Sequence, residues 1–262
     1  GSHLRKAISL HDQNPSRAKV LTASLDGAYA TIDLSAASDR IACALIERAF
    51  RRCKTLLLAV YASRTRRIQN GTGLHGPTTS VSLRKCFTMG SACTFPLQTV
   101  VFATISVAAI LMDGGGRVDD DQVRSVCSKV RVFGDDIIVP TKNYGTVVRL
   151  LEYLGLKVNP DKSFSEGNFR ESCGMDAFRG IDVTPARINR LPSTASPKSM
   201  VSTVDACNNF AKKWLWETSA YIESTLPNWV KLNLARVRMD SGQFGLSTFS
   251  GFQIQHLKTR WN

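Results

Sequence analysis

The sequence lacks the patterns of a zinc site, a disulfide framework and an EF-hand. Its four histidines are scattered, and its seven cysteines are odd in number and contain no C-x-x-C pair. Structural zinc sites need closely spaced Cys and His ligands, and disulfide scaffolds pair cysteines in even numbers. The acids between Asp113 and Asp121 do not follow EF-hand spacing, so we expect a solvated loop there. We expect the cysteines to be reduced and mostly buried, as in a cytosolic protein.

Long hydrophobic runs, a signal-peptide pattern, internal repeats and low-complexity segments are also missing. The longest apolar stretch runs from Val100 to Met112 and is interrupted by Thr104 and Ser106. A membrane-spanning helix needs about 20 apolar residues, so this stretch predicts a buried helix instead. We therefore expect no membrane partner.

Acidic residues are scarce relative to basic ones, because 21 Asp and Glu stand against 34 Lys and Arg, for a net charge of +13. Runs of charge are usually solvated faces, but an imbalance of this size is unusual for an enzyme that acts on small molecules. It indicates a polyanionic partner, bound in a way that depends on salt and little on sequence. The basic residues cluster at Arg5-Lys6, Arg17 and Lys19, Arg48 to Lys54, and Arg64 to Arg67.

Two adjacent carboxylates stand at a glycine turn between two apolar runs, within Val130 to Val139. Val, Phe and Ile favour strands and Gly134-Asp135-Asp136 supplies the turn, so we predict a tight hairpin. The two acids repel each other at a hairpin tip unless a cation lies between them. An exposed, Asp-rich turn is the structural explanation of this pattern, and a divalent-metal site is the functional one.

A second acidic element lies upstream of this hairpin. The strand-forming run from Tyr29 to Ile32 ends at Asp33, small residues follow, and an apolar helical pattern continues from Ile41. Asp39 would lie near the start of this helix, where its charge suits the helix dipole. A role for Ser38 or Asp39 as the helix N-cap explains part of the arrangement, but not the acid at the end of the strand.

Between these two elements, a loop of small residues around Gly90 runs into the long apolar segment. Pro96 stands at a position suited to a first helical turn. Glycine lets a nucleic-acid backbone or a ribose approach closely, and the helix behind it would give rigid support. Such loops are common before helices, so this segment is weak evidence when taken alone.

The order and spacing of the three elements resemble motifs A, B and C of the palm domain of RNA-dependent RNA polymerases. More closely, the chain is similar to the replicase catalytic (beta) subunit of levivirus-type positive-strand RNA bacteriophages, the group of phage Qβ. The likeness covers roughly residues 8 to 190, and its F-R-E-S-C-G run is specific to this phage group. The segments that carry it are Ile32–Asp39, Thr88–Gly90 with Thr94-Phe95, Phe133–Ile138, Lys162–Gly174 and Gly180–Pro185.

This resemblance implies RNA-templated RNA synthesis by two-metal nucleotidyl transfer from NTPs, which releases pyrophosphate. Asp33 and Asp135 would be the main ligands of two Mg²⁺ ions, and Asp136 would support one of them. Carboxylates suit Mg²⁺ because it prefers hard oxygen ligands, and Mn²⁺ would be able to substitute for it.

The resemblance also implies how the nucleotide is recognised. Asp39 would accept a hydrogen bond in the network that reads the ribose 2′-OH, and Gly90 and Thr94 would shape the nucleotide and template site. Polymerases that select deoxynucleotides place a bulky aromatic side chain near this point. No aromatic residue follows Asp33 until Phe50, which favours ribonucleotides.

Lys162 is the candidate general acid for the leaving pyrophosphate. A lysine offers three donors on a flexible stem and can give up a proton as charge develops. A solvated surface lysine is the alternative for this residue. Nearby, Arg170 and Glu171 are candidates for a structural ion pair.

The implied architecture is α+β. It is the palm of a right-handed polymerase, a ferredoxin- or RRM-like antiparallel sheet backed by helices, with parts of the fingers and thumb. We expect residues 1–28 to be a basic lead-in on the fingers side. Residues 29–182 would form the palm, with a fingers insertion at about 46–86. Residues 183–262 would be a helical region on the thumb side.

Two local predictions belong to the outer regions. Within the insertion, Asn70-Gly71-Thr72-Gly73 predicts a hairpin turn. In the last region, four aromatic residues at helix-like spacing predict thumb-side packing, with base stacking by one of the tryptophans as the alternative. These residues are Trp214, Trp216, Tyr221 and Trp229.

Two alternative functions stay open. A reverse transcriptase would share the acids, but those enzymes usually carry an aromatic-x-Asp-Asp pattern rather than Gly134 before the pair. A degenerate palm could bind RNA without catalysis, although clustered carboxylates facing a phosphate backbone would serve no purpose in a binding protein.

The family's basic NTP-binding motif upstream of motif A is not found in this sequence. We therefore expect the chain to be part of a longer polymerase, and the resemblance implies polymerase chemistry for that parent protein rather than for this part alone. The resemblance implies an RNA template and product strand, NTPs, host elongation factors Tu and Ts and a ribosomal protein as partners. It also implies the cytoplasm of an infected bacterial host as the location.

Overall fold

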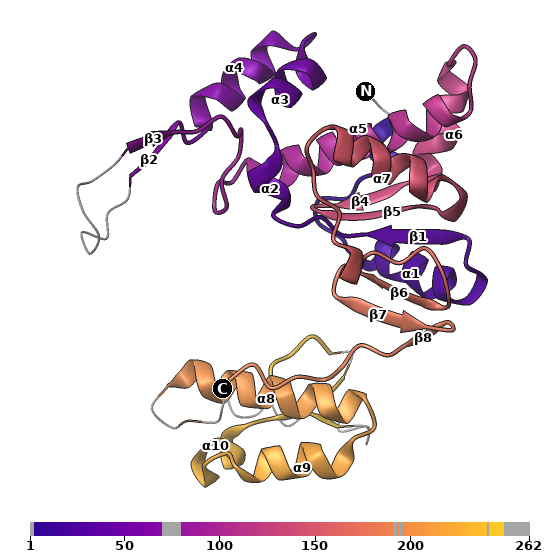
Figure 1. The fold of residues 1–262 in the computed structure, drawn as a ribbon. Helices are drawn as coiled ribbons and strands as arrows, with labels where there is room; N and C mark the ends of the chain where they lie inside the picture. The colour runs from indigo at the N-terminus through magenta and orange to yellow at the C-terminus, as the bar shows by residue number, and fades with distance from the viewer. Residues whose placement is uncertain (1–2, 70–79, 191–192, 194–195, 240, 249–262) are drawn as a thin grey trace. The chain divides into compact units, whose positions relative to one another are not determined.

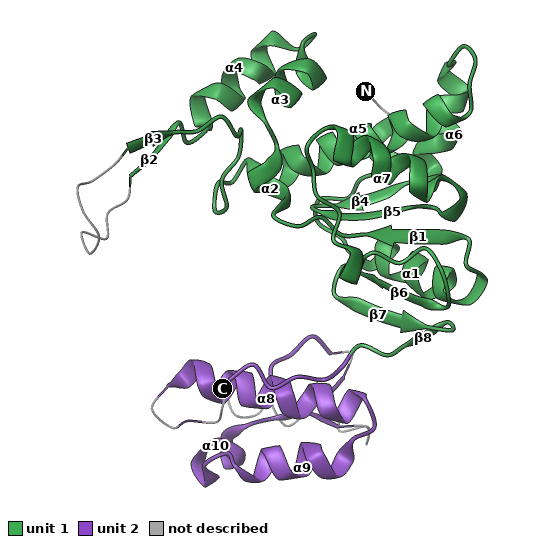
Figure 2. Cartoon of the chain, in the orientation of Figure 1, with its two compact units in different colours: residues 1–184 green, residues 185–262 purple. Residues whose placement is uncertain are grey.

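The structure is a computed structural model that describes residues 3–69, 80–190, 193, 196–239 and 241–248. Helices and antiparallel sheets are both present, so the predicted α+β class is confirmed (Figure 1). The chain divides into two compact units, residues 1–184 and residues 185–262 (Figure 2). Each unit has a hydrophobic core of its own.

A three-stranded antiparallel sheet lies at the centre of unit 1. Its strands are β1 (Tyr29–Ile32), β4 (Arg131–Phe133) and β5 (Asp136–Pro140), in the order β1-β5-β4. Antiparallel bridges from Thr31 of β1 to Phe164, and from Leu34 just after β1 to Val158, add a further segment beside β1. The segment 158–164 therefore runs beside the strand that ends at Asp33.

Both faces of this sheet are covered, which explains why β5 is apolar from Ile137 to Pro140. Successive strand residues point to opposite faces. Ile137 and Val139 belong to a core cluster shared with α5 (Thr94–Asp113) and α7 (Tyr144–Tyr153), whereas Ile138 belongs to a second cluster that includes Val20 of α1 (Asn14–Asp26). Helices α5 and α7 thus pack on one face of the sheet, and α1 packs on the other.

The other elements of unit 1 extend this framework. β6, β7 and β8 form a second antiparallel sheet, and β2 and β3 form a two-stranded antiparallel ribbon. The turn predicted at Asn70–Gly73 lies outside the described residues. The elements are η1 (His3–Lys6), α2 (Ala37–Arg40), α3 (Cys43–Phe50), α4 (Lys54–Ser63), β2 (Arg67–Gln69), β3 (Ser80–Ser82), α6 (Asp120–Lys129), η2 (Thr141–Asn143), η3 (Pro160–Lys162), β6 (Phe169–Ser172), β7 (Met175–Phe178) and β8 (Ile181–Asp182).

The helix predicted after Asp33 is wrong in its start and its continuity. It is split into α2 and α3, and the N-cap of α2 is Ala36, with a φ of 51°, rather than Ser38 or Asp39. The break has a physical cause, because residues 41–43 pair with residues 84–86 of another segment. The Cys86 N–H donates to the Ile41 carbonyl at 2.7 Å, and a backbone paired in this way cannot continue a helix.

The loop predicted at 113–121 is shorter than expected, because α6 begins at Asp120. Asp119 is its N-cap, accepts a hydrogen bond from the Gln122 N–H at 2.8 Å, and forms a capping box with that residue. This box satisfies two N–H groups that the start of a helix leaves unpaired. The acids of this segment therefore serve the helix start.

The long apolar stretch forms α5, as predicted. By length and composition α5 could cross a membrane, and it is the one helix among the described residues that passes this test. Half of its most apolar window is buried within the structure, and it packs against α6, α7 and β4. Core helices of globular proteins have the same composition.

The described residues of unit 2 form three helices and a parallel pair of short strands. These are α8 (Pro197–Lys212), α9 (Trp216–Ser224), α10 (Asn228–Asn233), β9 (Arg236–Arg238) and β10 (Leu246–Thr248). Its core is mainly aliphatic, with Val204, Ile222 and Leu226 among its buried residues. Trp214, Trp216, Tyr221 and Trp229 are 43% to 72% exposed and lie outside this core. The rings of Trp214 and Trp216 pack edge to face, with centroids 5.5 Å apart.

Candidate functional site

Three of the predicted acids meet at one end of the central sheet. Antiparallel pairing sets Ile32 of β1 opposite Ile137 of β5, so Asp33, which follows β1, lies beside the turn that precedes β5. That turn contains Asp135, and Asp136 is the first residue of β5. The register of two strands distant in sequence therefore brings the carboxylates together.

The turn between β4 and β5 is a two-residue hairpin loop, as predicted. Phe133 pairs with Asp136, which leaves Gly134 and Asp135 as the loop residues. Gly134 has a φ of +64°, which suits glycine at the first position of a type II′ turn. Its N–H donates to the Thr99 hydroxyl at 3.0 Å, so the turn is tied to α5.

An aromatic contact with α5 also supports this turn. The rings of Phe95 and Phe133 lie edge to face, with centroids 4.9 Å apart. A Cβ atom added at Gly134 would lie 2.8 Å from the Phe95 ring. The first turn of α5 thus supports the hairpin tip and leaves no room for a side chain at Gly134.

Asp33 is held by the segment that runs beside β1. The Asn159 side-chain amide donates to Asp33 Oδ2 at 3.0 Å, and the Asn159 N–H donates to the Asp33 carbonyl at 2.9 Å. The Asp33 N–H in turn donates to the Ser163 hydroxyl at 3.1 Å. Asn159 and Ser163 were not predicted, since only the fold reveals that this segment lies beside Asp33.

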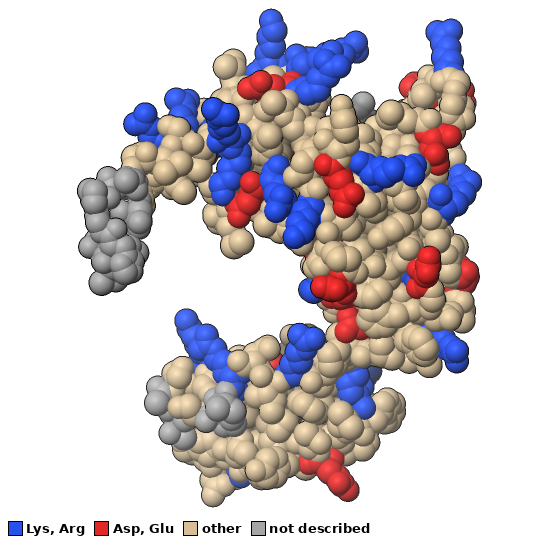
Figure 3. All heavy atoms as spheres, viewed as in Figure 1, with Lys and Arg blue, Asp and Glu red and all other residues tan. Residues whose placement is uncertain are grey.

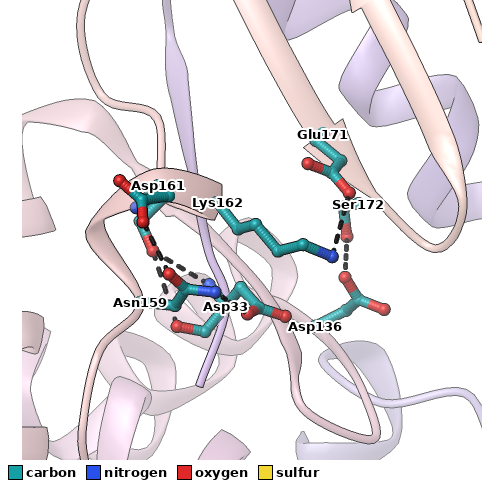
Figure 4. A network of polar contacts seen from close by, with 8 residues as sticks. Asp33, Asp136, Asn159, Asp161, Lys162, Glu171 and Ser172 are labelled. Carbon is teal, nitrogen blue, oxygen red and sulfur yellow. Dashed lines mark hydrogen bonds and ion pairs between the residues drawn. The ribbon is translucent and has the colours of Figure 1, made fainter. Parts of the chain in front are cut away.

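Asp136 is held from the other side by the end of β6. The Ser172 hydroxyl donates to Asp136 Oδ1 at 3.1 Å (Figure 4). Burial raises the pKa of Asp136, and the hydrogen bond from the Cys173 N–H opposes this rise. Each of these two carboxylates therefore accepts a hydrogen bond from a neutral donor, and neither forms a close ion pair within the described residues.

The acids also influence one another electrostatically. Burial is the main cause that raises the pKa of Asp135, and the negative charge of Asp33 raises it further. A hydrogen bond from the backbone N–H of Asp135 and the positive charge of Lys162 both lower this pKa. Buried carboxylates that repel one another are stabilised by a bound cation. The donors are carboxylate oxygens only, which fits a hard divalent ion such as Mg²⁺. Among the described residues, however, no three acidic, His or Cys side chains are close enough to form a ready-made metal cluster.

Lys162 lies at the end of η3, and its side chain extends past Asp33 toward Glu171 and Ser172 (Figure 4). Its Nζ is 3.6 Å from Glu171 Oε1. The predicted pair between Arg170 and Glu171 is wrong, because neighbouring strand residues point to opposite faces. Glu171 instead pairs with Lys162, which places a flexible ammonium group beside the acids.

Arg170 is buried, with 1% of its surface exposed, and it donates only to backbone carbonyls. Its Nε bonds the Tyr29 carbonyl at 2.7 Å, which joins β6 to β1. Its other donors bind the carbonyls of Ser165, Glu166 and Gly167 in the loop before β6 and that of Phe169, the first residue of β6. This contact holds the segment that carries the partners of Asp33.

The three predicted nucleotide-binding residues make their contacts around the loop before α5. Asp39 pairs with Lys85, which was not predicted. Gly90 is exposed, and its φ of +90° is in the left-handed region. The Thr94 hydroxyl donates to the Thr88 carbonyl at 2.8 Å, which closes the loop at the start of α5.

The predicted basic clusters lie largely on the surface. Lys and Arg side chains gather over the part of unit 1 that contains α3, α4 and the β2–β3 ribbon (Figure 3). Both strands of that ribbon are exposed along their length. A polyanion could therefore reach this region without any rearrangement of the core.

Comparison with known proteins gives a consistent result. Residues 2–233 match the family described as RNA replicase, beta-chain. The chain is 30% identical to the RNA-directed RNA polymerase subunit beta of Enterobacteria phage SP, over 94% of this chain and 41% of the relative. It is 31% identical to the subunit of the same name from Escherichia virus Qbeta, over 82% of this chain and 33% of the relative.

A third relative is the RNA-directed RNA polymerase beta chain of Escherichia phage MS2, which is 34% identical over 70% of this chain and 30% of the relative. The chain thus spans between 30% and 41% of the length of these curated relatives.

Proposed function

The chain belongs to the RNA replicase beta-chain family, and on this basis we propose that it forms the catalytic core of an RNA polymerase that copies an RNA template. The observation that carries the proposal is the convergence of Asp33, Asp135 and Asp136 at one end of the central sheet. Phosphoryl transfer needs positioned groups and cations rather than covalent help from the protein, and clustered carboxylates supply the ligands for such cations.

Asp33 and Asp135 would hold two Mg²⁺ ions, or Mn²⁺ in their place, with support from Asp136. When bound, such ions neutralise charge on the attacking and leaving oxygens of an in-line displacement. Asn159 and Ser172 hold the carboxylates of Asp33 and Asp136 in fixed orientations. Hydrogen-bonded partners of this kind tune ligand geometry.

In the reaction, the 3′-hydroxyl of the growing strand would lose its proton to water as its oxygen forms a bond to the α-phosphorus of the NTP, and the bond from that phosphorus to the pyrophosphate oxygen would break. Lys162 Nζ would donate a proton to that leaving oxygen as its charge develops. Its flexible stem and its pairing with Glu171 at 3.6 Å keep the ammonium group beside the acids. The pyrophosphate would then leave in protonated form.

Selection of ribonucleotides would rest on the loop before α5 and on α2. Asp39 would accept a hydrogen bond from the ribose 2′-OH, while Gly90 and Thr94 shape the nucleotide and template site. The absence of an aromatic side chain between Asp33 and Phe50 leaves room for the 2′-OH. The same site would therefore favour NTPs over dNTPs.

We assign the parts of the chain as follows. Residues 29–182 would be a ferredoxin-like polymerase palm, with residues of about 46–86 in the fingers. Residues 1–28 would lie on the fingers side and residues 183–262 on the thumb side. The antiparallel sheet with helices on both faces supports the palm assignment. The exposed ribbon, with the Lys and Arg side chains gathered over that part of unit 1, supports the fingers assignment.

The proposed partners are the RNA template, the product strand and NTPs. The relatives are named as beta subunits or beta chains, which indicates assembly with other chains. Host elongation factors Tu and Ts and a ribosomal protein are the partners we propose, in the cytoplasm of an infected bacterium.

The deciding experiment measures RNA-templated incorporation of NTPs and dNTPs by the complete protein with Mg²⁺. Asp135→Asn is compared with Asp121→Asn, a matched change at an exposed acid of α6. We expect incorporation of NTPs only, abolished by Asp135→Asn and unchanged in the control.

Two other outcomes would replace this proposal. Incorporation of dNTPs would indicate a reverse transcriptase. Binding of RNA without any product, in the presence of the proposed host factors, would indicate an RNA-binding module.

A further inference from the structure

We propose that Lys85 is a positioning residue for ribose selection, because it fixes the carboxylate of Asp39 through an ion pair. This inference rests on the proposed function and adds a residue to it. Lys85 stands just before the loop that contains Gly90, and Asp39 lies on α2. The pair therefore connects the two segments that would surround the sugar of the incoming nucleotide.

The backbone around Lys85 is rigidly placed. Residues 84–86 pair with residues 41–43, through the Cys43 N–H to the Arg84 carbonyl at 3.0 Å and the Cys86 N–H to the Ile41 carbonyl at 2.7 Å. An antiparallel bridge sets Ala42 opposite Lys85. Cys86, the next residue, is 1% exposed and belongs to the core of unit 1. The stem of Lys85 thus starts from a fixed point.

Asp39, by contrast, lies on the exposed side of a short helix whose buried residue is Ala37. Helix α2 has only four residues, and no side chain caps its start. A helix this short has little stability of its own. The ion pair with Lys85 supplies a second attachment for the Asp39 side chain, beyond the backbone of α2.

The chemistry of the pair leaves Asp39 able to bind a hydroxyl. Lys85 Nζ contacts Asp39 Oδ1, and Oδ2 makes no hydrogen bond within the described residues. A carboxylate oxygen accepts up to two hydrogen bonds. The side chain of Asp39 is 42% exposed, so a ligand can reach it, and that of Lys85 is 27% exposed. One oxygen is therefore held while the other remains available to the 2′-OH.

A fixed acceptor discriminates better than a mobile one. A site built to bond a hydroxyl rejects the analogue that lacks it, because the polar group of the site is then left unpaired. Without Lys85, Asp39 could turn toward water and lose little when a dNTP binds. Selection would fall, although Asp39 itself is unchanged.

The test compares kcat/KM for an NTP with kcat/KM for the matching dNTP, in the complete protein. The variants are Lys85→Met, Lys85→Arg and Asp39→Asn, with Lys142→Met as a control at an exposed lysine of η2. Melting temperatures of all variants are measured in parallel. We expect Lys85→Met to lower the ratio of the two kcat/KM values by about tenfold or more, since small misplacements of a site group have effects of this size.

The loss should come mainly from the NTP value, and Lys85→Arg should restore most of it because arginine keeps the charge. The double variant Lys85→Met with Asp39→Asn should be no less selective than Asp39→Asn alone. A ratio that stays at the wild-type value in Lys85→Met, or an equal loss for both nucleotides together with a lower melting temperature, would make the pair purely structural and overturn the inference. A wild-type protein that incorporates no nucleotide would instead overturn the proposed function and this inference with it.

Discussion

At the scale of single residues, the acidic site depends on residues other than its carboxylates. Gly134 allows the turn because it has a positive φ and no side chain to meet the Phe95 ring. Asn159 and Ser172 orient two of the acids from segments that lie far away in sequence. The acids Asp33, Asp135 and Asp136 could be predicted from their local patterns, whereas their supporting residues could not, because Asn and Ser occur widely and only the fold brings them near.

Gly134→Ala should destabilise unit 1 and lower activity. The backbone in a left-handed conformation costs about 1–2 kcal/mol for a residue with a Cβ, and overpacking against the Phe95 ring adds about 1–3 kcal/mol. Gly155→Ala is the matched control, because Gly155 has a φ of +84° but nothing within 4 Å of an added Cβ. Urea denaturation should show a clearly larger loss for Gly134→Ala, and equal losses would contradict the role of the Phe95 contact.

Asn159→Ala and Ser172→Ala should each lower the rate of nucleotide incorporation by about tenfold, since partners that orient metal-binding carboxylates contribute on this scale. The fold should be retained, because both hydrogen bonds lie at the edge of the site. Single-turnover kinetics at varied Mg²⁺ would measure the effect. A rate that stays at the wild-type level at every Mg²⁺ concentration would show that neither residue orients its carboxylate.

At the scale of secondary structure, the sequence predicts the sheet and its hairpin better than the short helices. The run Val130 to Val139 encodes strand, turn and strand within ten residues. The split between α2 and α3 could not be predicted, because it results from backbone pairing with residues 84–86. The structural role of Arg170 in β6 could not be predicted either. It depends on the Tyr29 carbonyl and the loop before β6, which only the fold brings around its guanidinium group.

Arg170→Met should destabilise unit 1 by about 3 kcal/mol or more, because buried carbonyls lose their donors. Arg170→Lys should recover only part of this loss, since an ammonium group has three donors for five carbonyls. Arg117→Met, at an exposed arginine, is the control. Chemical denaturation followed by circular dichroism would measure the change, and a loss no larger than that of the control would refute the structural role of Arg170.

At the scale of the whole molecule, both units carry more basic than acidic residues. They differ in how much of their structure and function the sequence predicts. The motifs lie within residues 1–184, whereas residues 185–262 contain no motif that the sequence makes legible. This second region carries ten Lys and Arg against four Asp and Glu. Its aromatic residues at helix-like spacing predicted packing on the thumb side, and the core of this unit is filled mainly by aliphatic side chains instead.

Both units should lose stability at alkaline pH. Burial raises the pKa of Cys86 in unit 1 and of Cys207 in unit 2 to about 11. In an unfolded chain a thiol ionises at a pKa of about 8.5, so between these values the unfolded state binds fewer protons than the folded state. The free energy of unfolding should therefore be unaffected by these groups below pH 8 and should fall as the pH rises toward 11.

Urea denaturation at several pH values, with a reductant present, would measure this loss. Cys86→Ala and Cys207→Ala should each flatten the alkaline part of the curve, whereas Cys53→Ala, at an exposed cysteine, should not. An alkaline slope that is the same in all three variants would assign the effect to other groups.

The contacts of Arg170 also affect which positions of the loop before β6 can change in sequence during evolution. Its guanidinium binds main-chain carbonyls, the one acceptor that all twenty amino acids carry. Substitutions at Ser165 or Glu166 therefore leave these hydrogen bonds in place, and selection to keep them acts on the single codon of Arg170. Residues 165 and 166 can thus vary in sequence without loss of the contact, whereas Asn159 and Ser163 are tied to Asp33 by their side chains.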